Sequence, residues 1–179
     1  MIICYEDLKL RAIEFEDLEL IREMINDPVI ENMTGGGGLP VSRYQQEEWF
    51  KTLKDRKDEV RLIIDTEEHG AIGTVMLTDV DYRNGTAQFH SKIATSKDLR
   101  GKGYGTKATK AILKYAFEQM NLHCVYSHIL EYNVASQRVK EKCGFTKEGV
   151  LRDRVYKNGA YQNLAVWSIT KEEFSEREV

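Results

Sequence analysis

A glycine-rich segment between a predicted strand and a predicted helix contains the residues with the clearest chemistry. It reads Arg100, Gly101, Lys102, Gly103, Tyr104, Gly105, Thr106. Glycines at alternate positions remove side chains, so an anionic group can approach the backbone N–H groups at the start of the helix, where the dipole also favours negative charge. Arg100, Lys102 and Lys107 add charged donors. The segment predicts a phosphate or pyrophosphate site; the alternative is a bare turn without a ligand.

The spacing of the glycines separates this loop from two other phosphate-binding loops. A dinucleotide-binding loop has Gly-x-Gly-x-x-Gly, whereas here Gly101, Gly103 and Gly105 follow Gly-x-Gly-x-Gly. A P-loop ends in Gly-Lys-Ser/Thr, and here no lysine separates Gly105 from Thr106. Neither pattern therefore explains the loop.

The loop resembles the Arg/Gln-x-x-Gly-x-Gly motif with which the GNAT N-acetyltransferase superfamily binds the pyrophosphate of coenzyme A, read here as Arg100, Gly103 and Gly105. Residues 133–149 are similar to a second block of that superfamily, Asn-x-x-Ser/Ala followed by Lys-x-Gly-Phe-x-x-Glu-Gly. Residues 8–18, 48–50 and 152–170 resemble the branch of ribosomal-protein alanine acetyltransferases and spermidine acetyltransferases. The resemblance covers nearly the whole chain and implies a single acetyltransferase domain, residues 1–179.

The resemblance implies acetyl-CoA as cosubstrate, with no metal. It places the pantetheine arm in a slot between two diverging strands, with the end of the strand before the glycine loop on one side. Asn133 is expected to bind the pantetheine, to cap the following helix, or both. The implied cofactor-binding residues are Ile93, Ala94, Thr95, Arg100, Gly101, Lys102, Gly103, Tyr104, Gly105, Thr106 and Asn133.

Acetyl transfer to an amine requires a neutral amine and a donor for the carbonyl oxygen, and the leaving thiolate benefits modestly from a proton. Spermidine-type relatives carry an acidic residue where this chain has Gln88, so we expect His90, on the same strand face, to be the base. Many relatives have a tyrosine acid where this chain has Lys140. The alanine-acetyltransferase relatives use a serine instead, at the place of Ser136.

Each of these two catalytic assignments has a plain structural alternative. His90 is equally compatible with a packed or surface strand residue. Ser136 is equally compatible with a serine in the first turn of a helix that contacts only backbone. Because the enzyme can work largely by positioning its substrates, its acid and base are hard to recognise from sequence.

The glycine loop identifies the acetyl donor but not the acceptor. We expect a primary amine: a protein N-terminal amine, or a small amine such as a polyamine, an aminoglycoside or an amino sugar. Tyr126 and His128 share a strand face and are candidates for lining the acceptor pocket, and residues 35–38 are either a mobile lid or a linker. Carboxylates that would suit a polyamine, but that also occur on ordinary surface helices, are Glu16, Asp17, Glu31, Glu47 and Glu48.

Two other classes of function remain open. A non-catalytic CoA-binding sensor or interaction module is suggested by Gln88 and Lys140, which stand at positions that are often catalytic in relatives. A regulator that binds ATP through the glycine loop is disfavoured by the missing P-loop lysine and by the lack of a clear Mg²⁺ carboxylate.

The overall composition is that of an ordinary globular domain. The 179 residues are 41% hydrophobic and 31% charged, with a net charge of -3. This balance disfavours nucleic-acid binding, and no apolar run is long enough to span a membrane. Cys4, Cys124 and Cys143 have neither metal-ligand nor disulfide-framework spacing. We expect a cytoplasmic protein, with a homodimer as one possible assembly.

Hydrophobic periodicity and turn residues predict an α/β (α+β) fold with a mixed, mostly antiparallel central sheet flanked by helices. Strands are expected at 8–12, 60–65, 71–81, 86–95, 124–130, 145–156 and 160–170. Helices are expected at 16–26, 42–54, 104–119 and 134–143. The connection through the glycine loop and its helix allows strands 86–95 and 124–130 to lie parallel.

Overall fold

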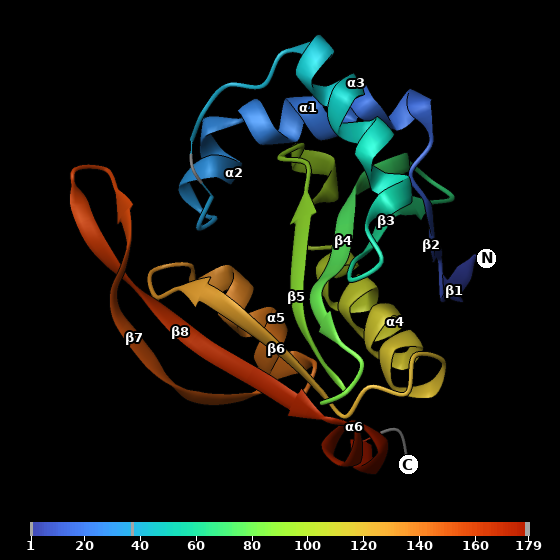
Figure 1. Ribbon diagram of the computed structural model, residues 1–179, viewed down its shortest axis with the longest axis vertical. Helices are drawn as coiled ribbons and strands as arrows, with labels where there is room; N and C mark the ends of the chain where they lie inside the picture. The colour runs from blue at the N-terminus through green and yellow to red at the C-terminus, as the bar shows by residue number, and fades with distance from the viewer. Residues whose placement is uncertain (1, 37, 178–179) are drawn as a thin grey trace.

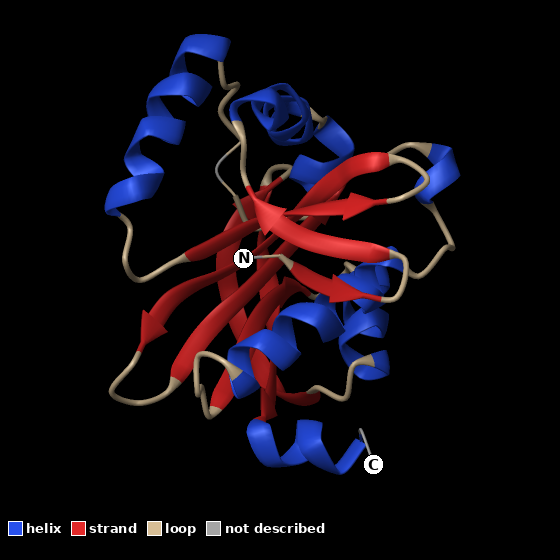
Figure 2. Cartoon of the chain, turned by 90° about the vertical axis from the view of Figure 1, so that its right-hand side faces the viewer, coloured by secondary structure: helices blue, strands red, loops and turns tan. Residues whose placement is uncertain are grey.

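The computed structural model describes residues 2–36 and 38–177, which form one eight-stranded sheet with helices on both faces (Figures 1 and 2). The N-terminal elements are β1 (Ile3–Tyr5), β2 (Leu8–Ala12), α1 (Leu18–Asn26), α2 (Pro28–Asn32), α3 (Arg43–Thr52), β3 (Val60–Thr66) and β4 (Gly70–Asp81). The later elements are β5 (Thr86–Ile93), α4 (Tyr104–Glu118), β6 (Cys124–Leu130), α5 (Val134–Lys142), β7 (Thr146–Lys157), β8 (Ala160–Thr170) and α6 (Lys171–Arg177).

The strands lie in the order β1-β2-β3-β4-β5-β6-β8-β7. Within the described residues β5 and β6 run parallel and the other neighbouring strands run antiparallel. The predicted α/β fold with a mostly antiparallel sheet is therefore confirmed. The short elements β1, α2 and α6 were not predicted.

The extra helix α2 begins at a proline, Pro28. Asp27 has an extended backbone, as expected before a proline, and α1 ends one residue earlier. Pro28 then occupies the first turn of α2, where its missing N–H costs nothing. Asp27 caps α2 by accepting a hydrogen bond from the backbone N–H of Val29.

Other boundaries follow the local sequence signals. Ser42 and Gln45 form a reciprocal capping box at the start of α3. Gly144, with a φ of 89°, takes the left-handed position after α5. Asn158 and Gly159 both have positive φ and connect β7 to β8 in a tight hairpin.

Hydrophobic clusters fix the helices on both faces of the sheet. The larger cluster lies between the sheet and α4, and its most buried members include Leu77, Phe89, Ile112, Leu113 and Phe117. The smaller cluster is formed by Ile21, Met24, Ile30 and Ile63, with Trp49 packed against it. It holds α1, α2 and α3 over the opposite face, at one end of β3 and β4.

The two central strands separate partway along their length (Figure 1). The parallel ladder between β5 and β6 ends at the pair Gln88–Tyr126, whereas β5 continues to pair with β4 as far as Ile93. Ser127 Oγ, on β6, donates a 3.0 Å hydrogen bond to the carbonyl oxygen of Phe89 just beyond the last pair. The splayed strands expected from the family resemblance are therefore present.

Gly73 of β4 lets the end of β5 approach closely. A Cβ at position 73 would overlap the carbonyl oxygen of Lys92 and lie 2.9 Å from Ile93 Cα. Because these neighbours are backbone atoms, they can move only by displacing the strand. Gly73→Ala should lower the free energy of unfolding by about 1–3 kcal/mol, as overpacking does elsewhere, which urea denaturation measures. Gly149→Ala on β7, whose added Cβ meets nothing within 4 Å, is the matched control. Equal stability of the two variants would contradict the prediction.

Candidate active site

The glycine loop presents backbone N–H groups at the start of α4. Gly101 and Gly103 have φ values of 77° and 78°, in the left-handed region that favours glycine. Gly103 precedes the helix, and no side chain caps it. The first helical hydrogen bond runs from the N–H of Lys107 to the carbonyl oxygen of Gly103, so the N–H groups of the preceding turn have no helical acceptor. A Cβ at Gly101 or Gly103 would meet nothing within 4 Å, which leaves open space for an anion.

Two of the three cations predicted to assist this loop are already paired. Lys102 Nζ lies 2.8 Å from Glu68 Oε1, and Lys107 Nζ lies 2.6 Å from Asp7 Oδ1. These contacts raise the pKa values of both ammonium groups. Arg100 is exposed beside the loop. The positive charge available to a ligand here therefore comes from Arg100 and the helix terminus, unless Glu68 releases Lys102.

The side chains within the loop do not all face outward. The Tyr104 ring is buried, with 3% of its surface exposed, and packs edge-on against His69. The backbone carbonyl oxygen of Thr106 accepts a hydrogen bond from Cys143 Sγ. The predicted roles of Tyr104 and Thr106 in cofactor binding are thus limited to their backbone N–H groups or, for Thr106, its half-buried hydroxyl.

The end of β5 offers a free strand edge on the side of β6. Ile93 pairs with Gly73 of β4, and the N–H of Ala94 donates to the carbonyl oxygen of Ile72. Beyond Gln88, no strand pair joins β5 to β6 in the described residues. Such an edge suits an extended amide-containing chain, which can hydrogen bond as an added strand does. Thr95 is already engaged, since its hydroxyl donates to Asp27 Oδ2.

Asn133 and Ser136 lie at the start of α5. The Asn133 side chain accepts from the N–H of Ser136 at 3.1 Å, which confirms the predicted capping role. Its amide nitrogen donates to the carbonyl oxygen of Met33 at 2.9 Å, which ties α5 to the segment after α2. Ser136 is half-buried in the first turn. No hydrogen bond between described residues joins Ser136 to His90, so their shared role in catalysis stays a prediction.

His90 faces away from α4, on the half of the sheet that α1 and α3 cover. Its Nε2 lies 3.1 Å from Thr78 Oγ1. Burial, reinforced by the positive charges of Arg61 and Lys140, lowers the pKa of His90 to about 4. The imidazole is therefore neutral at pH 7 and able to accept a proton, but it is a weaker base than a free imidazole.

The residues that share this face include two that the sequence analysis assigned to the acceptor site. Gln88 Nε2 and His128 Nδ1 lie 3.3 Å apart and bridge β5 to β6, and the Tyr126 ring packs beside His128. Sequence reasoning missed Lys92 and Arg61, which occupy the same face. The two-residue period of β5 from His90 to Lys92 was the signal that could have found Lys92. The proposed lid at 35–38 includes Gly37, which lies outside the described residues.

Lys140 stands where many relatives have the tyrosine. It is 2% exposed, and its Nζ lies 3.6 Å from the centroid of the Phe89 ring and 5.0 Å from that of Phe145. No carboxylate in residues 2–36 or 38–177 forms an ion pair with it. Burial lowers the pKa of Lys140 to about 7, so the amine is partly neutral at physiological pH.

The comparisons with known proteins agree with this geometry. The family model described as an acetyltransferase (GNAT) domain matches residues 7–146. The chain belongs to the GNAT N-acetyltransferase superfamily. It is accordingly an N-acetyltransferase that uses acetyl-CoA. No helix within the described part of this GNAT chain is both long and apolar enough to cross a membrane.

Individual relatives cover nearly all of this GNAT chain. The SPbeta prophage-derived uncharacterized N-acetyltransferase YokL of Bacillus subtilis is 32% identical, over 94% of this chain and 93% of its own. Spermidine N-acetyltransferase from Vibrio cholerae, solved in complex with CoA and spermine, matches with a TM-score of 0.88 and 28% identity, over 94% of this chain and 98% of that one. A dodecameric structure of the same V. cholerae enzyme matches with a TM-score of 0.80 and 28% identity, over 97% of this chain and 99% of that one.

Gly103→Glu should abolish measurable acetyl-CoA binding in a calorimetric titration, because it adds a side chain and a negative charge at the start of α4. Gly103→Asn is the matched control, since asparagine tolerates positive φ and adds no charge. We expect the Asn variant to retain a larger share of the affinity than the Glu variant, with both folded by circular dichroism. Unchanged affinity of Gly103→Glu would refute the assignment of the loop.

Lys140→Met should stabilise the protein at pH 7 by about 1–4 kcal/mol, as replacement of buried charges by apolar residues does elsewhere. The pKa of Lys140 is lower in the folded state than in the unfolded state. Such a lysine destabilises the fold by its full amount at pH values below the folded-state pKa, and the destabilisation decreases as the pH rises toward the unfolded-state pKa. The wild-type free energy of unfolding should therefore rise with pH above about 7. Urea denaturation from pH 6.5 to 9.5 should show a weaker rise for the variant. A less stable Met variant at pH 7 would overturn this account.

Proposed function

We propose that this chain transfers the acetyl group of acetyl-CoA directly to a primary amine in a ternary complex, within one catalytic domain spanning residues 1–179. The observation that carries the proposal is the free edge of β5 beyond Gln88, which leads to the glycine loop at the start of α4. An extended cosubstrate with an anionic end fits both features at once. The acceptor amine would approach from the face that carries His90.

In this proposal the cosubstrate contacts are divided between strand and loop. Ile93, Ala94 and Thr95 provide the strand edge for the amides of the pantetheine arm. Arg100, Gly101, Lys102, Gly103, Tyr104, Gly105 and Thr106 hold the pyrophosphate, mainly through their N–H groups. Asn133 keeps α5 against the segment after α2 and is the proposed contact of the arm at the start of α5. Lys102 would have to exchange Glu68 for phosphate oxygens.

The catalytic contribution rests mostly on positioning, with two side chains assisting. The amine nitrogen attacks the carbonyl carbon of the thioester, the C–S bond breaks, and the amine loses a proton. His90, which is neutral, is the proposed acceptor of that proton, directly or through water. The hydroxyl of Ser136 is the proposed donor to the departing sulfur. Because a thiolate is a good leaving group, neither step demands a strong acid or base.

The alternative function is a non-catalytic CoA-binding sensor or interaction module. Gln88 favours it, because a neutral amide replaces the acidic residue of spermidine-type relatives. Localisation in the cytoplasm stays a prediction. For assembly, we propose that several copies associate, with a homodimer as the simplest unit; the dodecameric neighbour supports association without specifying a dimer.

Calorimetric titration with acetyl-CoA, with ATP as control, tests the cosubstrate, and release of free CoA thiol in the presence of amines tests transfer. We expect micromolar binding of acetyl-CoA, none of ATP, and thiol release that depends on the amine. Ser136→Ala should lower kcat with little change in KM for the amine. Tight binding of acetyl-CoA without transfer to any amine would favour the sensor, and no binding would refute both functions.

The pH dependence of kcat/KM distinguishes His90 from an ordinary histidine base. Because the pKa of His90 is lowered to about 4, no ionisation of His90 should limit the rate between pH 6 and 8. Over that range the rate should rise with the fraction of neutral amine acceptor. His90→Gln should lower the rate without changing the shape of this profile. A limb near pH 6.5 that disappears in His90→Gln would show that the histidine titrates at its usual value.

A further inference from the structure

The face that carries His90 has two further cations within reach of a bound acceptor. Arg61 of β3 pairs in register with Met76 of β4, which pairs with His90 of β5. Lys92 lies one strand repeat beyond His90, on the same face and about 7 Å further along the strand. Two strand spacings, or about 10 Å, separate β3 from β5, a gap that the long side chains of Arg61 and Lys92 can largely close.

Lys92 is half-buried and has no carboxylate partner among residues 2–36 and 38–177. Burial and the positive charges of Arg61 and Lys157 lower its pKa, and only Glu31 acts in the other direction. Glu31 is itself paired with the buried ammonium of Lys157. A half-buried ammonium without a counterion costs free energy, and an anion bound beside it would recover part of that cost.

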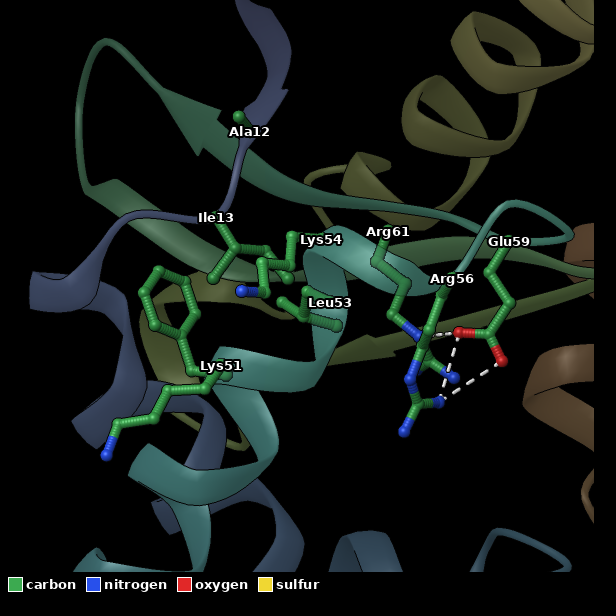
Figure 3. A pocket seen from close by; sticks show the side chains of 9 residues that line it. Ala12, Ile13, Lys51, Leu53, Lys54, Arg56, Glu59 and Arg61 are labelled. Carbon is green, nitrogen blue, oxygen red and sulfur yellow. Dashed lines mark hydrogen bonds and ion pairs between the residues drawn. The ribbon is translucent and has the colours of Figure 1, made fainter.

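Arg61 also carries positive charge that is incompletely neutralised. Its Nε lies 2.6 Å from Glu59 Oε2, and Arg56 Nη1 lies 3.2 Å from the same oxygen. Figure 3 shows the two guanidinium groups converging on this one carboxylate. One carboxylate between two guanidinium groups leaves one positive charge in excess.

An open hollow of about 520 Å³ adjoins Arg61. The apolar lining comes from the end of β2, from the residue after β2, and from the end of α3 with the turn that follows it (Figure 3). The charged residues at the rim are mostly basic. The lining residues are Ala12, Ile13, Phe50, Lys51, Leu53, Lys54, Arg56, Glu59 and Arg61. The hollow therefore lies on the Arg61 side of this face, and neither His90 nor Lys92 lines it.

The carboxylates near this face are poorly suited to a polycation. Glu31 forms an ion pair with Lys157, and Asp27 accepts a hydrogen bond from the hydroxyl of Thr95. Asp79 lies close enough to His90 to affect its pKa, but it is exposed to solvent, where its attraction for a ligand is weak. Gln88 contributes no charge. A polyamine bound here would place extra ammonium groups against Lys92 and Arg61.

We infer that the acceptor of this acetyltransferase is a primary amine that also carries an anionic group, a carboxylate or a phosphate, bound by Lys92 and Arg61 while the amine lies near His90. The inference rests on the proposed acetyl transfer and adds the chemical class of the acceptor. Its physical basis is charge complementarity, which selects among ligands of similar shape by opposing the wrong sign of charge.

A matched series of amines tests the class directly. γ-Aminobutyrate, butylamine and putrescine each carry a primary amine at one end of a similar four-carbon chain. The other end is a carboxylate, a methyl group or a second primary amine, respectively. Aminopropyl phosphate separates phosphate from carboxylate as the preferred anion, and spermidine represents the polyamines. With acetyl-CoA and the full chain, kcat/KM for the better anionic amine should exceed that for putrescine by about tenfold or more.

Substitution of the cations should change this order. Lys92→Gln should lower kcat/KM for the anionic amine about tenfold more than it lowers kcat/KM for butylamine, mainly through KM. Lys92→Glu should reverse the preference toward putrescine. Lys9→Gln, which removes an exposed strand lysine on β2, is the control and should leave the order of the amines as in wild type. Circular dichroism and acetyl-CoA affinity show whether each variant is folded.

Each outcome separates this inference from the proposed function. A preference for anionic amines that Lys92→Gln removes supports both. Efficient acetylation of spermidine or putrescine, with anionic amines no better than butylamine, keeps the acetyltransferase and overturns the anionic acceptor. An equal loss for all amines in Lys92→Gln gives that lysine a merely structural role and overturns the assignment. If no amine in the series increases the release of thiol, the proposed function is refuted, and the acceptor class is refuted with it.

Discussion

The site depends on the point at which β5 and β6 stop sharing hydrogen bonds. A parallel pair satisfies the edges of both strands, and while it continues no other chain can bind there. After Gln88 the strands diverge, and the edge of β5 becomes available on the side where α4 and α5 begin. The hydroxyl of Ser127 satisfies the carbonyl oxygen of Phe89 at the fork, so the first residue after the last pair is not left without a partner.

Positive side chains without a full counterion lie on both faces of the sheet at β5. Toward α5, Lys140 is enclosed by aromatic rings without a counterion, and its charge is partly suppressed. On the opposite side, Lys92 and Arg61 lie on the same face of the sheet as His90, which is neutral. Both sides therefore hold positive charge that the fold itself leaves incompletely compensated, close to where an anionic cosubstrate and its acceptor would meet. Uncompensated buried charges lower the stability of the fold, and groups of this kind cluster at functional sites. A role in ligand binding therefore explains their presence better than a role in stability does.

Sequence patterns predicted most of the scaffold because each long element carries its own local signal. The alternating burial at the end of β8, the capping box at Ser42 and the turn at Asn158 all follow from residues within a few positions of one another. The short elements β1, α2 and α6 lack enough residues for a periodic signal. The splay of β5 and β6 was available only through family resemblance, because strand periodicity says nothing about where a ladder ends.

The sequence was sufficient to locate the glycine loop of the candidate site, but not to predict the ion pairs and ionisation states of the site's charged residues. Glycine spacing identified the backbone donors before α4, since that signal is contiguous in the chain. The pairing of Lys102 with Glu68, and of Lys107 with Asp7, joins residues far apart in sequence and could not be anticipated. The low pKa of His90 likewise results from burial and from Arg61 and Lys140, which arrive from other elements. Sequence gives the residue type, while the fold determines its ionisation.

The contacts that enclose the segment after α2 come from the far end of the chain. Tyr132 and Asn133 donate hydrogen bonds to the carbonyl oxygens of Asn32 and Met33, across 100 residues of sequence. Lys157 reaches Glu31 across 126 residues. The enclosure of this segment therefore cannot be complete until β7 has been synthesised, whereas the pairing of β4 with β5 and the turn of the glycine loop join residues that are near one another in the chain. A nascent chain would therefore complete its contacts around this segment only after the residues of the strand edge and the glycine loop have been synthesised.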